Sequence, residues 1–589
     1  MNYIYVLSAV LLSFLIIWGL LFKLQKNRNI NIRDASLTVE ELEVHAKSMS
    51  LEHSVSSKKN ILNWPLTRMN DNFSFIRQVY KDLNDDIIKK HLLPPVAEWL
   101  LDNYYVIEEQ VKGLRKDLSK KSYFNLPVLK KGPYKGVTRI FALAMELVSH
   151  THGRIEEDTL LKYLNSYQSN SILFEREIYV IPAMLRLALI ENIRIICEDI
   201  LETRKQWNLA DETVEKWLAE TNFDTDEINE LFKSNGKAIN DAIDTANPSF
   251  LEHLFYRLRS SGRRYSDVLR YIDENLDKFH TTTEIIAQKE HTAQAVSTVS
   301  MGNCIVSLKH LSSINWTDLF DAASYLEEIL KKDPMATYSL MDTNSRFYYK
   351  NRIEEIAKTY GVSELYIAKE ALSLAQNAIS SSNITADDEN PDNRRYHIGY
   401  YIVGDGLKEL EKMQEKNIKF FAKLKNSIEN HQGIIYMLSI MVFTLLLTLL
   451  SIGYAVSFVS SNFLFYIILT AVAVIIPASE IVISIINRLV FRVKKPAVFP
   501  RLELKDGIPD SMSAMVVIPV LLSNKKRVDE MMDNMENHYL GNKEKNLYFA
   551  LIGAFKDSDN EINKDDKSIV KEASDKIVAL NNKYTDGKK

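Results

Sequence analysis

The sequence predicts a mainly α-helical membrane protein whose last segment begins an α/β domain. Three observations support this fold class: apolar stretches long enough to cross a bilayer, amphipathic patterns at helical spacing between them, and two short β-branched runs near the end. The chain has 589 residues, of which 46% are hydrophobic and 25% charged, so it can bury more than one core. Several domains are therefore expected.

The first apolar stretch, residues 3–22, is predicted to be a transmembrane anchor within residues 1–24. A cleaved signal peptide would carry positive charge before its apolar run and small residues at a cleavage site behind it. Here the positive charges follow the run, at Lys23, Lys26, Arg28 and Arg33. This asymmetry places the next domain in the cytoplasm.

Residues 25–430 are predicted to form a cytoplasmic domain of packed helices. Residues 182–207 are representative, with apolar residues at helical spacing at Leu185, Leu189, Ile193, Ile196 and Ile200. Similar patterns recur over residues 92–118, 249–278, 316–332 and 346–376. Polar segments at residues 27–38, 208–226 and 380–393 are predicted to be linkers or loops.

Two groups of residues in this helical domain invite a chemical role. His150 and His152, with Arg154, are the tightest histidine cluster. Two residues apart on a helix, the histidines would face different sides, and no third ligand lies nearby. A helix end or turn at Gly153 is therefore favoured over a metal site. An aromatic and basic run could contact phosphates or sugars, although a solvated, ion-paired helix face is favoured. Its residues are Phe255, Tyr256, Arg257, Arg259, Arg263, Arg264 and Tyr265.

Two further apolar stretches, residues 434–459 and 463–486, are separated by three polar residues and predict a transmembrane hairpin over residues 434–486. Basic residues flank both outer ends, which are therefore predicted to be cytoplasmic. They are Lys416, Lys419, Lys423 and Lys425 before the hairpin, and Arg488, Arg492, Lys494 and Lys495 after it.

Glu480, three residues after Pro477, lies inside the second stretch of the hairpin. Ionisable residues within a membrane are enriched at functional sites, such as proton relays or the lining of a substrate path. The favoured interpretation is structural: Pro477 breaks the helix, and the carboxylate packs on the partner span beside the freed backbone groups. A direct functional role for Glu480 is the alternative.

The last segment, residues 511–589, reads as strand, helix and strand. Residues 515–522 and 547–555 are apolar runs, the first of which contains Pro519, and residues 525–539 form a helical pattern between them. This order is typical of the beginning of a nucleotide-binding α/β domain. The segment has no glycine-rich phosphate loop, so neither a P-loop nor a dinucleotide-binding motif is indicated.

Charge and cysteine content narrow the possible functions. The 73 basic and 77 acidic residues nearly cancel, so no overall field favours nucleic acid. Cys197 and Cys304 lie far apart and in no Cys-x-x-Cys or Cys/His spacing, which argues against a zinc site or a disulfide framework. A reduced, cytosolic environment fits best.

Six segments carry a resemblance to a known family. They are residues 93–110 (LPPVAEWLLDNYYVIEEQ), 139–168 with its HTHGR, 178–194 (IYVIPAMLRLALIENIR), 300–353, 397–405 (HIGYYIVGD) and 500–509 (PRLELKDGIP). Within residues 300–353 the matching positions are Gly302-Asn303, Ile314-Asn315-Trp316, Asp333-Pro334, Tyr338 and Met341-Asp342. Each motif alone is weak, but their order and spacing over most of the chain resemble the amino-terminal membrane region of cyclic β-1,2-glucan synthases.

This resemblance implies that residues 511–589 are the incomplete beginning of a GT-A-like glucosyltransferase domain, which uses UDP-glucose to build a β-1,2-linked glucan. The complete family enzyme is expected to need a divalent cation, Mg²⁺ or Mn²⁺, held by carboxylates, and a carboxylate base. These groups are expected beyond the second strand. We therefore identify neither metal ligands nor catalytic residues in this chain, and we expect the chain alone to be inactive.

The candidate nucleotide-sugar-binding residues lie on the two predicted strands. Pro519 and Val520 are on the first strand, while Phe555 and Asp557 mark the end of the second. Ala554 stands where the resemblance implies an acidic residue placed to hydrogen-bond the uracil. Asp557 or Asp559 can substitute for it; alternatively, both are ordinary loop residues, a position that Asp favours.

The resemblance also implies a location and partners. The location is the bacterial inner (cytoplasmic) membrane, with the main domains facing the cytoplasm. The partners are the membrane, UDP-glucose, β-glucan and separate or downstream catalytic and phosphorylase-like regions, without nucleic acid. One alternative is a noncatalytic membrane scaffold or interaction protein for a glucan-synthesis complex. A membrane sensor or transport component ranks last, because the spans are few and carry no other charge.

Overall fold

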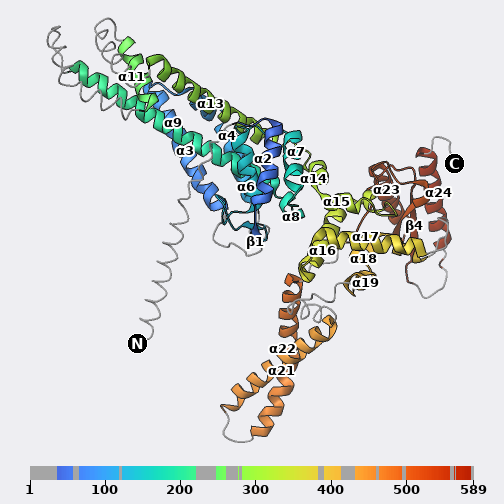
Figure 1. The fold of residues 1–589 in the computed structure, drawn as a ribbon. Coiled ribbons are helices and arrows are strands. Elements are labelled where there is room, and N and C mark those ends of the chain that lie inside the picture. Colours follow the sequence, from blue (N-terminus) through green and yellow to red (C-terminus); the bar gives the residue numbers. More distant parts are fainter. Residues whose placement is uncertain are drawn as a thin grey trace, which may run out of the picture. The chain divides into compact units, whose positions relative to one another are not determined.

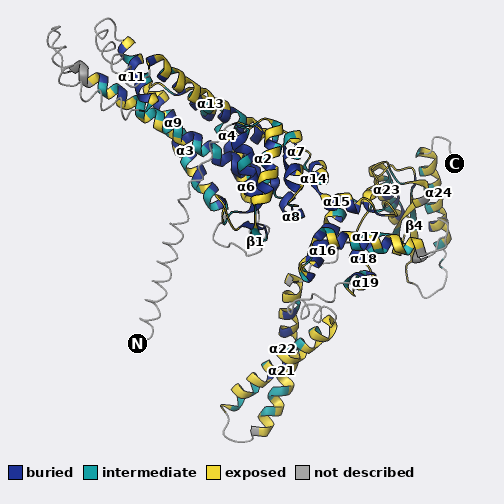
Figure 2. Cartoon of the chain, in the orientation of Figure 1, coloured by how far each residue is buried: buried dark blue, intermediate teal, exposed yellow. Residues whose placement is uncertain are grey.

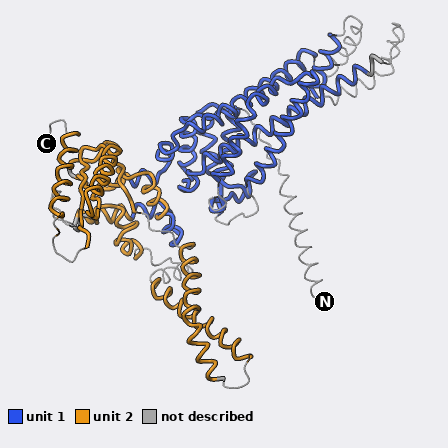
Figure 3. The backbone as a smooth tube through the Cα atoms, turned by 180° about the vertical axis from the view of Figure 1, so that it is seen from behind, with its two compact units in different colours: residues 1–330, 353–370 blue, residues 331–352, 371–589 orange. Residues whose placement is uncertain are grey.

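The computed structural model describes residues 36–56, 65–118, 123–219, 247–260, 276, 282–381, 391–412, 431–458, 463–493, 499–557, 563 and 565–584. They fall into two compact units, residues 1–330 with 353–370 and residues 331–352 with 371–589 (Figure 3). The predicted anchor, residues 3–22, lies outside the described residues.

The first unit is built mainly from helices (Figure 1). They are α2 (Val39–Glu52), α3 (Pro65–Lys89), α4 (Pro95–Asp117), α6 (Arg139–His150), α7 (Glu157–Gln168), α8 (Glu175–Ile178), α9 (Ile181–Ala219), α11 (Pro248–Ser260), α13 (Thr283–His310), α14 (Trp316–Ala323) and α15 (Tyr325–Leu330). Two short strands, β1 (Val55–Ser56) and β2 (Val128–Leu129), pair antiparallel.

Helix α9 lies at the centre of the core of the first unit. It packs against α3, α4, α6, α11 and α13, and most of its apolar positions are buried (Figure 2). The predicted core positions of this helix are confirmed: Leu185, Leu189, Ile193, Ile196 and Ile200 are all at most 2% exposed. Burial of this stripe, rather than intrinsic propensity, stabilises so long a helix.

The prediction of a loop beginning at Asn208 is wrong, because α9 continues to Ala219. Ala210 and Val214 in this extension are buried, and α11 packs along it. Asp211 also forms an ion pair with Arg257 of α11, with 2.8 Å between Asp211 Oδ1 and Arg257 Nε. Tertiary packing therefore extends the helix through a polar stretch that reads locally as a linker.

The helix predicted over residues 316–332 is two helices, α14 and α15, separated at Ser324. Ser324 is extended (φ −95°, ψ 109°) and its hydroxyl accepts a hydrogen bond from the Glu327 amide at 3.0 Å. The same hydroxyl donates to the buried carboxylate of Glu175. The bond from the Glu327 amide begins α15, and the bond to the distant Glu175 fixes Ser324 outside both helices.

The helix predicted over residues 346–376 is likewise divided, into α16 (Thr343–Tyr360) and α17 (Glu364–Ser381). Gly361 ends α16 with φ +73°, and the amides of Gly361 and Val362 both donate to the Ala357 carbonyl. This is a left-handed helix end that favours glycine. Two boundaries between the units fall within these two helices, after Arg352 and after Glu370, and a third follows Leu330.

The second unit combines short helices, an apolar helical hairpin and an α/β segment. Its remaining elements are η2 (Tyr338–Leu340), η3 (Pro391–Tyr396), α18 (Ile398–Ile402), α19 (Leu407–Lys412), α21 (Gln432–Val456), α22 (Phe463–Val493), η5 (Asp510–Met512), β3 (Ala514–Leu522), α23 (Lys525–Gly541), β4 (Leu547–Phe555) and α24 (Asp566–Tyr584). The protein as described is mainly helical, as predicted.

The hairpin helices α21 and α22 are long and apolar enough to cross a bilayer. They pack against each other, and the Tyr436 hydroxyl donates to Asn487 Oδ1 at 2.9 Å. Most of their other apolar side chains are exposed (Figure 2). An apolar surface of this extent fits a lipid environment better than water.

The expected helix break at Pro477 is wrong, because α22 runs through this residue without interruption. A proline inside a long apolar helix is tolerated when the freed backbone groups find other partners. The carbonyl that loses its helical donor at Pro477 is that of Ala473, whereas a nearby local bond runs from Ser479 Oγ to the Ile476 carbonyl at 2.7 Å. Glu480 is exposed rather than packed on α21, so its carboxylate faces away from the partner helix.

Candidate functional site

The predicted strand, helix and strand near the end of the chain are present as β3, α23 and β4. The two strands pair parallel along their whole length, from Ala514 opposite Leu547 to Leu522 opposite Phe555. Their carboxyl ends are therefore level with each other. In open parallel sheets, ligands bind at this edge.

Helices cover one face of the strand pair. Val528, Met532 and Met535 of α23 and Ile569 of α24 form a small core. Against this core pack four apolar residues of the strands: Ile518, Leu522, Phe549 and Leu551. Because side chains alternate along a strand, the residues between them point to the opposite face.

The opposite face, which we call the open sheet face, is apolar and exposed. It is formed by four register pairs: Met515 with Tyr548, Val517 with Ala550, Pro519 with Ile552, and Leu521 with Ala554. Met515 is 61% exposed and Ile552 is 62% exposed. Neighbouring exposed apolar residues in one surface are typical of a face that contacts other protein.

The four candidate nucleotide-sugar residues occupy different environments. Val520 is buried, on the face covered by helices, so it positions the strand and does not reach a ligand. Pro519 lies on the open sheet face opposite Ile552. Phe555 ends β4 and is 44% exposed, and Asp557 is exposed just beyond it. Asp559 lies outside the described residues.

Sequence reasoning missed the residues that begin α23 at this same edge. Asn524 caps the helix, accepting a hydrogen bond from the Arg527 amide at 2.8 Å. Lys525, Lys526 and Arg527 then occupy the first turn. Lys525 pairs with Glu572 and Arg527 with Glu530, both at 2.9 Å, so Lys526 is the cation of this turn that we consider for binding an anion at the helix N-terminus.

The residues described at this edge do not form a site for Mg²⁺ or Mn²⁺. Between the end of β4 and the first turn of α24 the described carboxylates are Asp557, Asp565 and Asp566, and these do not converge on a common point as the ligands of such a cation must. A cation bound at this edge would therefore need ligands from other residues. The sequence expectation that this chain supplies no metal ligands for the transfer reaction stays a prediction.

The segment before β3 is tied to both the α/β segment and an earlier motif. The buried Asn546 side chain donates to the Ile508 carbonyl and to Asp510 Oδ1, both at 2.7 Å. Upstream, Met341 and Leu502 form an antiparallel bridge, and the Glu503 amide donates to the Leu340 carbonyl at 2.7 Å. Two segments that carry the family resemblance therefore meet here.

A second polar cluster joins the segment of residues 300–353 to the segment of residues 397–405. Asp333 Oδ2 lies 2.8 Å from Nδ1 of His397, and His397 Nε2 lies 3.1 Å from the Tyr349 hydroxyl. A Cβ added to Gly399 would lie 2.1 Å from the Tyr349 hydroxyl oxygen, so the site requires glycine there. Burial raises the pKa of Tyr349, so its hydroxyl stays protonated and supports structure.

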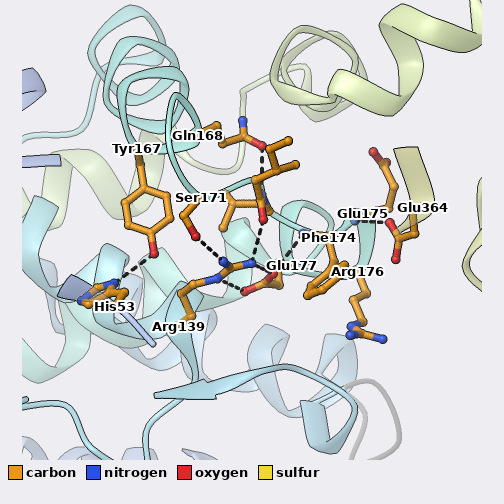
Figure 4. A network of polar contacts seen from close by, with 12 residues as sticks. His53, Arg139, Tyr167, Gln168, Ser171, Phe174, Glu175, Arg176, Glu177 and Glu364 are labelled. Carbon is orange, nitrogen blue, oxygen red and sulfur yellow. Dashed lines mark hydrogen bonds and ion pairs between the residues drawn. The ribbon is translucent and has the colours of Figure 1, made fainter. Parts of the chain in front are cut away.

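Buried charges cluster in the first unit around the turn between α7 and α8 (Figure 4). Arg139, at 1% exposure, contacts the carboxylate of Glu177 and donates to the Ser171 hydroxyl at 2.9 Å. It also donates to the Ile172 carbonyl at 3.1 Å. A buried charge satisfied on every side holds a loop in one conformation.

In the same view, Glu364 lies beside Glu175, the residue that precedes Arg176 (Figure 4). Arg176 pairs with Glu354 at 2.7 Å, and the Glu175 amide donates to Glu364 at 3.4 Å. Burial, with the nearby charges of Glu354 and Glu175, raises the pKa of Glu364 to about 7. By contrast, hydrogen bonds outweigh burial at Glu146 and Asp333, two other partly or fully buried carboxyls, and lower their pKa values.

The aromatic and basic run on α11 is an ion-paired face where it is described, as favoured from the sequence. Arg257 pairs with Asp211, Phe255 is buried and Tyr256 is exposed. Arg263, Arg264 and Tyr265 lie outside the described residues. The run therefore provides helix packing rather than a described ligand site.

The turn predicted at Gly153 is confirmed. Helix α6 ends at His150, and both His152 (φ +48°) and Gly153 (φ +79°) are left-handed. Gly153 packs on Cys304, which is buried and free, like Cys197. The expectation that His150 has no further ligand nearby is wrong, because His45 and Glu146 lie beside it.

Comparison with known proteins agrees with the motifs. No protein-family model matches the chain. Cyclic beta-(1,2)-glucan synthase NdvB of Rhizobium meliloti (strain 1021) is 27% identical over 572 residues, which is 96% of this chain. The chain spans 19% of the length of that curated relative. The match confirms the resemblance that the motifs predict, and the chain is related to the cyclic β-1,2-glucan synthase family.

Proposed function

We propose that the chain is part of a membrane-bound glucosyltransferase that makes β-1,2-glucan from UDP-glucose. The observation that carries this proposal is the 27% identity to a curated cyclic beta-(1,2)-glucan synthase, extending over 96% of the chain. The parallel pairing of β3 and β4 supports it, because the carboxyl edge of such a pair is where nucleotides bind. The α/β segment is then the beginning of a GT-A-like domain.

Within this proposal the nucleotide sugar lies across the carboxyl ends of β3 and β4. Lys526, in the exposed first turn of α23, faces the diphosphate together with the helix N-terminus. Asp557, beyond β4, accepts a hydrogen bond from the uracil or ribose in place of an acid at Ala554. Phe555 provides apolar contact at the same edge.

The location proposed is the bacterial inner membrane, with the helical domain and the α/β segment in the cytoplasm. The apolar length of α21 and α22 supports a membrane location. Basic residues on the outer side of the hairpin support the orientation, since such residues are retained in the cytoplasm. UDP-glucose is a cytoplasmic substrate in this arrangement.

Binding of UDP-glucose to the purified full chain in detergent tests the nucleotide site directly. We expect the wild type to bind and Lys526→Ala to bind about tenfold more weakly, as expected for loss of one charged hydrogen bond. Lys571→Ala, an exposed lysine on α24, is the matched control and should bind as the wild type does. A wild-type chain with no affinity for UDP-glucose would place the nucleotide site elsewhere.

A second candidate function, a noncatalytic scaffold for a glucan-synthesis complex, is favoured by the open sheet face. An exposed apolar sheet face of this kind is suited to pack against another protein region. Co-purification with a second glucan-synthesis protein, without UDP-glucose binding by this chain, would support the scaffold. Labelling of membranes by UDP-glucose with this chain as the sole glucan-synthesis protein would rule the scaffold out.

A further inference from the structure

Two histidines and a glutamate converge where α2 meets the end of α6. His45 belongs to α2, whereas Glu146 and His150 stand four residues apart on α6 and so share one helix face. Nε2 of His45 lies 2.9 Å from Glu146 Oε2, and Nε2 of His150 lies 3.3 Å from the same oxygen. All three ligand atoms lie within 4.8 Å of one another.

These separations match those of ligands around a small metal ion. Zinc binds imidazole nitrogen and carboxylate oxygen at about 2.0–2.2 Å, which places neighbouring ligands of a tetrahedral ion about 3.3 Å apart. The two nitrogen-to-oxygen distances here are 2.9 and 3.3 Å. Small rotations of the side chains therefore suffice to admit an ion between them.

The surrounding structure holds the three ligands in place. The Leu37 amide donates to the His150 carbonyl at 3.0 Å, which joins the start of α2 to the end of α6. Thr38 and Glu41 form a capping box at that end of α2. A hydrogen bond from Tyr134 orients the Glu146 carboxylate. Ligands oriented by outer hydrogen bonds are typical of metal centres.

The cluster is also accessible from solvent on one side. The side chain of His45 is 31% exposed, compared with 14% for Glu146 and 9% for His150. An ion can enter past His45, and a water molecule can complete its coordination there. Three protein ligands and one open position are the arrangement of an accessible zinc site.

We propose that His45, Glu146 and His150 form a binding site for a divalent transition-metal ion of the zinc class. Two imidazoles and one carboxylate suit such ions, whereas Mg²⁺ prefers oxygen ligands. The ion bound here would therefore differ from the cation expected for sugar transfer. Because its ligands come from two helices, the bound ion links α2 to α6 and stabilises the attachment of α2 to the first unit.

Calorimetric titration of the chelator-treated full chain in detergent with ZnCl₂ tests the site. We expect one Zn²⁺ per chain, no binding of Mg²⁺, and binding at least about 100-fold weaker in His45→Ala, because loss of outer hydrogen bonds alone costs 10- to 100-fold. His291→Ala, whose side chain is 68% exposed on α13, is the control and should bind as the wild type does.

Glu146→Gln keeps the size of the side chain, so it separates the loss of a metal ligand from a defect in folding. We expect its helical circular dichroism to equal that of the wild type, while Zn²⁺ raises the unfolding temperature of the wild type alone. Co²⁺ should give the wild type a visible absorption band that Glu146→Gln lacks. Absence of stoichiometric Zn²⁺ binding by the wild type, or equal binding by His45→Ala and wild type, would overturn the proposal.

Discussion

Asp333 and His397 are 64 residues apart in sequence, yet Oδ2 of the first lies 2.8 Å from Nδ1 of the second. Asp333 also accepts hydrogen bonds from the amides of Ile398 at 2.9 Å and Tyr338 at 3.2 Å. Asp333, Tyr338 and His397 all belong to segments that carry the family resemblance. The motifs thus include the contacts that hold the second unit together.

Asp333→Ala is expected to destabilise the second unit by about 3–5 kcal/mol, because it leaves three buried donors without their acceptor. Burial alone raises the pKa of Asp333, but these hydrogen bonds outweigh burial and hold it below its ordinary value. The measurement is thermal unfolding of the full chain by circular dichroism. Asp506→Ala, an exposed aspartate of the same unit, should change stability by no more than about 0.5 kcal/mol.

Gly153→Ala is expected to destabilise the first unit through two separable effects. A Cβ at this position would lie 2.3 Å from Cys304 Sγ, and the backbone has φ +79°. Overpacking of this kind costs about 1–3 kcal/mol, in addition to about 1 kcal/mol for the left-handed backbone. Gly132→Ala isolates the backbone effect, since φ is +82° and no atom lies within 4 Å of the added Cβ. Equal unfolding temperatures for the two variants would contradict the packing argument.

Glu364 makes the stability of the first unit depend on pH. Its folded pKa of about 7 exceeds the ordinary value of 4.5, so its contribution is fully present below pH 4.5 and is lost as the pH rises through 7. The full loss is about 3 kcal/mol. Glu364→Gln removes the charge, so the variant should gain stability relative to the wild type between pH 4.5 and 7 and stay more stable above it.

Unfolding temperatures of wild type and Glu364→Gln, compared at pH 5 and pH 8, check this prediction. Glu370→Gln, on the same helix α17, is the control for the substitution itself. A difference between wild type and Glu364→Gln that does not change with pH would show that Glu364 ionises with an ordinary pKa.

The sequence predicted those parts of the fold that depend on local pattern. The stripe on α9 repeats at helical spacing, and the apolar runs of β3 and β4 have the length and composition of strands. The break at Ser324 was not predictable, because it depends on the carboxylate of Glu175, a contact across 149 positions.

The same reason limits prediction of the sites. His45 and Glu146 are 101 positions apart, so no local spacing relates them. Glu146 and His150 do stand at the spacing of two ligands on one helix face, a signal that a search for paired acids and histidines could have found. Asn524 before a helical run is a recognisable cap, and the cations that follow it were equally visible.

The open sheet face leads to the last prediction. Val517→Thr combined with Ile552→Thr makes this face more polar at two exposed positions, 43% and 62% accessible. Because neither side chain lies in the core, we expect the unfolding free energy to change by no more than about 0.5 kcal/mol. Val528→Thr changes a residue buried under the other face. It should lower the free energy of unfolding by about 1–3 kcal/mol, because it buries a hydroxyl in a side chain of nearly the same size. Light scattering during size-exclusion chromatography should show that the double variant self-associates less than the wild type in the same detergent. Self-association unchanged by the double substitution would mean that the open sheet face is not the surface through which the chain binds other protein.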